Sequence, residues 1–140
     1  MDEAKRVING TWGEAWLDQE KLGECTGLQS KMNFKKEDVS RCGTMATDKK
    51  IVGWDGTGSL KMNKVNSRLA KKVLKSVMAG KDVRFTIITK LADPDSYGVE
   101  RAVLKGVSFD DLTISDWAAG TPGTIEAPFT FSDVEYLDQI

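Results

Sequence analysis

Histidine is absent from this 140-residue chain, and cysteine and proline occur only two and three times. Without histidine, the chain cannot contain a Ser-His-Asp triad, a Cys-His dyad or a His-ligated metal site. Cys25 and Cys42 are 17 positions apart, a spacing typical of neither CxxC pairs nor zinc sites, so we expect free thiols rather than a redox pair. The sequence therefore predicts no metal and no cofactor.

Long apolar runs are also missing. No stretch approaches the roughly 18 consecutive apolar residues of a membrane-spanning helix. Residues 1–10 lack the apolar core of a signal peptide. With 40% apolar and 29% charged residues, the composition is that of an ordinary globular protein. We expect a single domain over residues 1–140, made in the cytoplasm and without direct membrane insertion.

The net charge of −1 conceals two regions of opposite sign. Residues 61–81 contain seven basic side chains and no acid, whereas residues 106–140 contain seven acids and no base. One interpretation is that each region forms a solvated face. The alternative is that the opposite potentials orient one copy of the chain against another, head to tail.

Alternation of apolar and polar residues predicts two long strands, over residues 22–34 and 51–63. A period of two places one face of each strand in the core and the other in water. Gly56 and Gly58 fall on the apolar side of the second strand, which indicates bending or a close backbone approach there. Shorter strands are expected over residues 11–17, 83–91, 99–107, 108–117 and 124–136.

A single helix is predicted over residues 66–79, where apolar residues repeat with a period of 3.6 and basic residues occupy the other half. Gly80 follows as a stop signal. We favour a helix packed on a sheet over one that binds a membrane or nucleic acid, because its apolar half has no Trp or Phe. Residues 35–50 follow neither period, so they predict a long loop with a functional role.

Together these elements predict a mainly β fold with one α-helix, a β-sandwich or squat barrel with the helix on one side. The two long strands exceed the usual five or six residues. Exposed edges of that length pair readily with another chain. The pattern therefore favours assembly.

Motifs for catalysis are missing, since no P-loop, dinucleotide-binding, metalloprotease or nucleophile-elbow pattern occurs. Residues 53–58 are glycine-rich but lack the lysine of a phosphate-binding loop. Two alternatives stay open beside an assembly protein. One is a monomeric β-sandwich that binds a small ligand or glycan through Trp12 and Trp16, and the other is a hydrolase with paired acids. We do not expect an enzyme.

Two segments carry a family resemblance: RVINGTWGEAWL over residues 6–17 and GWDGTGSLKMNKVNSR over residues 53–68. They resemble tail tube proteins of contractile-tailed phages, of the type in PBSX-like defective prophages and clostridial R-type bacteriocins such as diffocin. The resemblance covers nearly the whole chain. It implies a phage tail-tube β-barrel or sandwich, similar to the type VI secretion tube protein. Such subunits form hexameric rings that stack into a hollow tube inside a contractile sheath.

The resemblance also implies partners. These are further copies of the chain, the sheath protein, a baseplate initiator and a tube terminator, with DNA passing through the lumen without specific binding. The product would be a virion tail or a bacteriocin particle assembled in a bacterium.

Roles for individual residues follow from combining the resemblance with the strand pattern. The polar faces of the two long strands are the candidate channel lining, namely Gln29, Lys31, Asn33, Asp55, Thr57, Ser59 and Lys61. The segment 35–50 is expected to reach a neighbouring subunit or ring through Val39, Arg41 and Met45. An N-terminal arm over residues 1–10, including Arg6, is expected to make similar contacts.

Overall fold

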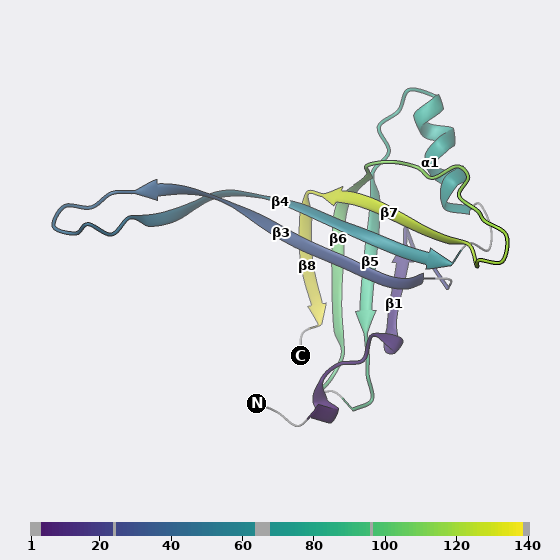
Figure 1. The fold of residues 1–140 in the computed structure, drawn as a ribbon, viewed down its shortest axis with the longest axis horizontal. Helices are drawn as coiled ribbons and strands as arrows, with labels where there is room; N and C mark the ends of the chain where they lie inside the picture. The colour runs from purple at the N-terminus through teal and green to yellow at the C-terminus, as the bar shows by residue number, and fades with distance from the viewer. Residues whose placement is uncertain (1–3, 24, 64–67, 96, 139–140) are drawn as a thin grey trace.

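The computed structural model describes residues 4–23, 25–63, 68–95 and 97–138. Their strands follow the hydrogen-bonded order β2-β1-β5-β6-β7-β4-β3, with β8 added on β6, and every pairing is antiparallel. Figure 1 shows two layers, in which β3, β4 and β7 cross over β1, β5, β6 and β8. The strands are β1 (Gly13–Leu17), β2 (Glu20–Lys21), β3 (Cys25–Val39), β4 (Asp48–Asn63), β5 (Phe85–Leu91), β6 (Glu100–Phe109), β7 (Thr124–Phe131) and β8 (Asp133–Asp138).

Strand β6 joins the two layers by turning a corner at Gly106, whose φ of 66° lies in the left-handed region that favours glycine. Before this corner β6 pairs with β8, and after it Ser108 and Phe109 pair with β7. The backbone N–H of Ser132 donates to the Lys105 carbonyl at 3.0 Å. This hydrogen bond places the break between β7 and β8 beside the corner of β6 at Gly106. The prediction of a mainly β fold with one α-helix is confirmed.

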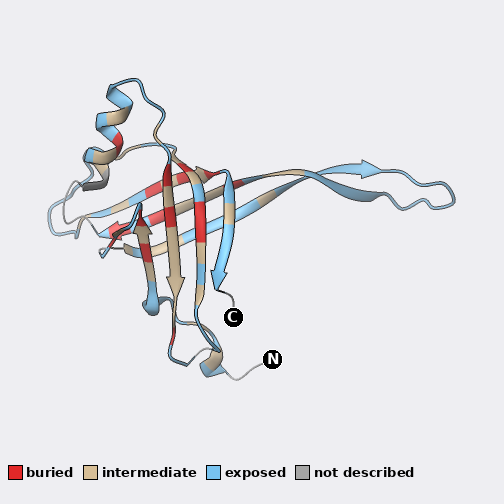
Figure 2. Ribbon diagram, turned by 180° about the vertical axis from the view of Figure 1, so that it is seen from behind, coloured by how far each residue is buried: buried red, intermediate tan, exposed pale blue. Residues whose placement is uncertain are grey.

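The core lies where the two layers cross. Its most deeply buried large side chains are Leu17, Leu60, Ile87, Leu104, Val107 and Phe129. Figure 2 shows that most of the buried stretches of the chain lie at this crossing. Phe109 packs edge-on against Phe129, with ring centroids 6.2 Å apart, and also lies 5.5 Å from Phe85. Burial of such apolar surface is the main favourable term in folding.

Helix α1 (Arg68–Met78) confirms the predicted helix over most of its length, while residues 66 and 67 lie outside the described residues. Val73 is buried and belongs to the core cluster. Lys72 is anchored by an ion pair to Glu20 of β2, with 2.6 Å between Nζ and Oε2. The predicted stop is also confirmed, because Gly80 has a φ of 76° and its N–H donates to the Val77 carbonyl.

Two predicted strands are wrong near the C-terminus. The strand expected over residues 108–117 does not form, since β6 runs through Gly106 to Phe109 and residues 111–117 have no regular structure. The strand expected over residues 124–136 is divided at Ser132 into β7 and β8. Both differences arise at the β6 corner, which is set by long-range hydrogen bonds and not by the local apolar pattern.

Trp12 also differs from its prediction. It belongs to the short 3-10 helix Gly10–Trp12, so it does not share a strand face with Trp16 in β1. The Asn9 side chain accepts from the Thr11 N–H and caps this turn. The aromatic platform expected for a glycan binder is therefore not formed by one strand.

The long loop predicted over residues 35–50 is half strand. β3 continues to Val39 and β4 starts at Asp48, leaving only residues 40–47 as a loop. We call residues 35–50 the arm. It projects from the body as a two-stranded ribbon (Figure 1), and Figure 2 shows it exposed along its length. Apolar alternation is missing here because both faces of the ribbon are wet.

Candidate assembly surfaces

The seven predicted channel residues lie on one face of the β3–β4 pair. The strand register places Gln29 opposite Ser59, Lys31 opposite Thr57 and Asn33 opposite Asp55. Residues directly opposite each other in antiparallel strands share a face. Lys61 follows Ser59 by two positions and continues the same face. We call this set, with the β7 residues described next, the polar face.

Strand β7 extends the polar face by residues that the sequence prediction missed. Glu126 lies opposite Lys61, and Thr130 lies opposite Thr57. The sequence does contain a signal for these residues, namely an alternation of polar and apolar positions. Glu126, Pro128 and Thr130 alternate with the buried residues Ala127, Phe129 and Phe131. The opposite face of β4 and β7 is the core face, where Leu60, Met62, Phe129 and Phe131 are buried.

Charge on the polar face is low and balanced. Two lysines, Lys31 and Lys61, are matched by two acids, Asp55 and Glu126. The Asn33 amide donates to the Thr57 hydroxyl oxygen at 3.0 Å, which satisfies two neutral side chains within the face. The face is thus hydrophilic without a strong potential of either sign.

Unpaired strand edges flank this layer. In the described part of the chain, β3 pairs with β4 alone, and residues 48–55 of β4 pair with β3 alone. Their outward N–H and C=O groups are open to another strand. The layer is therefore incomplete at an edge about fifteen residues long.

The arm presents all three side chains predicted for inter-subunit contact. Met45 in the loop is fully exposed, while Val39 at the end of β3 and Arg41 in the loop are also exposed. The structure adds Phe34 and Ile51, which are 55% and 53% exposed near the root of the arm. Within the arm, the Lys49 ammonium lies 3.9 Å from the Asp38 carboxylate and links its two strands.

Arg6, the fourth predicted contact, binds within its own chain. Its Nη1 donates to the Asp95 carbonyl at 3.0 Å, and its guanidinium carbon lies 5.0 Å from the centre of the Tyr97 ring. The buried Asp93 carboxylate accepts from the Asn9 N–H at 2.7 Å, so the N-terminal segment is held on the β5–β6 turn. A contact of Arg6 with a neighbouring subunit stays a prediction.

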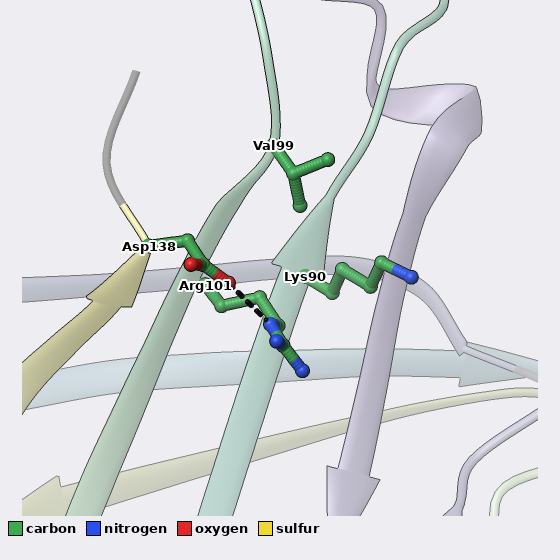
Figure 3. Close-up of a pocket in the computed structure, with 4 residues that line it drawn as sticks. All are labelled: Lys90, Val99, Arg101 and Asp138. Atoms are coloured by element: carbon green, nitrogen blue, oxygen red, sulfur yellow. Dashed lines mark hydrogen bonds and ion pairs between the residues drawn. The ribbon is translucent and has the colours of Figure 1, made fainter.

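The hollow shown in Figure 3 gives no support to catalysis. It is lined by Lys90, Val99, Arg101 and Asp138, and it is open to solvent. The Arg101 guanidinium and the Asp138 carboxylate lie 2.7 Å apart as a surface ion pair. Among the residues that the structure describes, no group of three Cys, Asp or Glu side chains is arranged to hold a metal ion, and no helix is long and apolar enough to cross a membrane.

Comparison with known proteins agrees with this picture. Residues 2–138 match the family model described as phage tail tube protein. XkdM, from the phage-like element PBSX of Bacillus subtilis strain 168, is 29% identical over 140 residues, which cover 99% of this chain and 95% of XkdM.

Two solved structures share the fold. A chain of the anti-feeding prophage tube-terminating cap superposes with a TM-score of 0.75 at 13% identity, with 99% of this chain and 96% of that chain covered. A chain from the sheath–tube complex of the PVC extracellular contractile injection system superposes with a TM-score of 0.72 at 11% identity, with 97% and 98% covered. Family match, fold and exposed strand edge agree: the chain belongs to the phage tail tube protein family and is a structural subunit of a phage-like tail tube rather than an enzyme.

Proposed function

We propose that six copies of this chain close into a ring, and that rings stack into the hollow inner tube of a contractile tail. The observation that carries the proposal is the layer formed by β3, β4, β7 and the end of β6. It has a core face, a polar face of low charge and an unpaired β3 edge. Pairing of this edge with the next subunit would continue the layer around a central hole and remove the exposed edge.

The dimensions of such a ring are reasonable. Four strands from each of six subunits give a barrel of 24 strands. At about 4.8 Å between strands, the circumference is roughly 115 Å and the backbone diameter roughly 37 Å, before strand tilt widens it. Side chains reduce this width but leave an open lumen.

In this arrangement the polar face lines the channel. Balanced charge and neutral side chains let a polymer pass without sticking to the wall, whereas a strongly basic wall would retain DNA. Passage of DNA without specific binding therefore fits this surface. The chain from the PVC sheath–tube complex and the chain from the anti-feeding prophage cap support a sheath and a tube terminator as further partners.

The arm has the role of a bridge to a neighbouring subunit or ring. It has no buried residue, because every side chain over residues 35–50 is exposed, including the apolar Val39 and Met45. Ordering these apolar side chains costs conformational entropy, and no burial within the subunit offsets that cost. We therefore expect them to be buried against another subunit in the assembled tube.

Negative-stain microscopy of the concentrated protein, alone and mixed with the purified baseplate of its particle, tests this proposal. We expect rings or tubes with a central stain-filled hole. The baseplate is included because tube growth can need an initiator. Particles that stay monomeric at every concentration and salt, with and without baseplate, would contradict the proposal.

A further inference from the structure

Helix α1 leaves part of its apolar half uncovered. Val73 points to the core, but Leu74, Val77 and Met78 are 43%, 56% and 78% exposed. Residues three and four apart are neighbours on a helix surface, so Leu74 and Met78 adjoin Lys71 and Lys75. We call Lys71, Leu74, Lys75 and Met78 the α1 strip. It joins an apolar row to a basic row, and neither lysine has an ion-pair partner among the described residues.

A segment of complementary character follows β6. Residues 110–117 carry Asp110, Asp111 and Asp116 together with Ile114 and Trp117, which are 64% and 83% exposed. We call residues 110–117 the acidic segment. No ion pair of these carboxylates occurs within the described residues. Over residues 111–117 the backbone makes no hydrogen bond to any described part of the chain either.

We propose that the α1 strip of one copy binds the acidic segment of a second copy. This inference rests on the proposed tube and names one of its subunit contacts. Charge complementarity is the first argument, because, within the described part of the chain, the α1 strip carries two lysines without ion pairs and the acidic segment carries three carboxylates without ion pairs. Apolar complementarity is the second, because Trp117 is an exposed anchor of the kind that dominates interfaces, and Leu74 and Met78 offer a surface for it.

The apolar part of the acidic segment, residues 114–117, also matches the α1 strip in length. From Lys71 to Met78 the helix rises about 10.5 Å, at 1.5 Å per residue. An extended chain from Ile114 to Trp117 spans about 10 Å, at roughly 3.3 Å per residue. Ile114 and Trp117 can therefore reach the two ends of the strip together, with Asp116 between them.

A second copy is the occupant that these observations favour. Each chain carries one strip and one segment. Leu112 packs against the core of its own chain, but Ile114, Asp116 and Trp117 are exposed, as are all four side chains of the strip. Contact between two different patches of identical chains is head to tail, and it repeats until it closes a ring or extends a filament. A tail tube needs this kind of contact, whereas a symmetric dimer would end growth.

Charge reversal tests the contact. The variants are Lys71→Glu with Lys75→Glu, Asp111→Lys with Asp116→Lys, and all four changes together. We expect each pair to raise the protein concentration needed for tube formation by about tenfold or more, because like charges then meet. The fourfold variant restores opposite charges with the signs exchanged, so its assembly should return to near the wild-type concentration.

A matched control is Lys81→Glu with Lys90→Glu, which changes the net charge as much as the strip variant but lies outside the strip. It should assemble like the wild type. The circular dichroism spectra of the monomeric variants should match that of the wild type. Such spectra would show that a defect in assembly comes from a lost subunit contact and not from unfolding.

Normal tube formation by both reversed pairs would overturn this inference and leave the proposed tube standing. Failure of the fourfold variant to recover would also overturn it. Tubes that form normally from the strip variant but no longer bind sheath would identify the sheath as the occupant instead. Wild-type protein that never forms tubes would contradict the proposed function itself.

Discussion

Gly56 and Gly58 set how closely β4 approaches the phenylalanines of β7. A Cβ at Gly58 would meet the Gln29 carbonyl oxygen and lie 2.6 Å from the Phe129 ring, and one at Gly56 would meet the Phe131 ring. The sequence predicted a close approach here because two glycines interrupted the apolar side of a strand. It could not predict the partners, since sixty residues of the chain separate β4 from β7.

The substitution Gly58→Ala should lower the free energy of unfolding by about 1–3 kcal/mol, because the added methyl group clashes with the Gln29 carbonyl oxygen and with the Phe129 ring. Chemical denaturation of the monomer measures this change. Gly27→Ala in β3 is the control, because a Cβ there meets nothing within 4 Å. Equal stability of the two variants would show that the glycine is not required by packing.

The elements of the fold differ in how far local sequence determines them. Strands over residues 25–34 and 51–63 were predictable because apolar and polar residues alternate along them. The buried face expected for both strands is confirmed for β4, where Leu60 and Met62 are buried. It is wrong for most of β3, because Met32 and Phe34 extend beyond the crossing of the layers and are 36% and 55% exposed.

Residues 35–39 and 48–50 were not predictable as strands, since strand pairs such as Glu37–Lys50 and Asp38–Lys49 are charged and show no apolar alternation. Charges on an exposed ribbon also discourage unwanted edge pairing, which explains why such a strand looks like a loop in the sequence.

The arm should be dispensable for folding but required for assembly. Replacing residues 39–48 with an Asn-Gly turn keeps Asp38 and Lys49 at the hairpin end, where a two-residue turn fits. The melting temperature of the monomer should change little, because the removed side chains are all exposed. Microscopy should show no stacked rings. Loss of the folded monomer would instead place the arm in its own subunit's core.

At the scale of the whole molecule, the charged regions noted in the sequence become defined surfaces. Part of the basic region, including Lys71 and Lys75, lies on the exposed side of α1, and part of the acidic region lies in residues 110–117. The sequence predicted the polar face because alternation is local. Which surfaces stay uncovered depends on how the layers cross, and no local pattern reports that.

Assembly should weaken as salt rises, if the α1 strip and the acidic segment steer subunits together. The Debye length falls from about 30 Å at 0.01 M to about 10 Å at 0.1 M, so exposed charges act over shorter distances. Light scattering at several salt concentrations measures the rate. A rate that does not change with salt would mean that apolar contacts and strand pairing dominate.

A cysteine on the polar face should report the channel. In a background of Cys25→Ala and Cys42→Ser, Ser59→Cys should react with a small maleimide dye in the tube but with a bulky polyethylene-glycol maleimide only after disassembly. Ready labelling of the intact tube by the bulky reagent would place the polar face outside.

The central claim is that identical copies complete one another's sheet around a hole, and a cryo-electron microscopy map of the assembled protein tests it most directly. The map should show six subunits per ring, the β3 edge hydrogen-bonded to the neighbouring subunit, and Lys31, Thr57 and Ser59 facing the lumen. Rings in which the β3 edge is unpaired, or in which these residues face outward, would contradict the account.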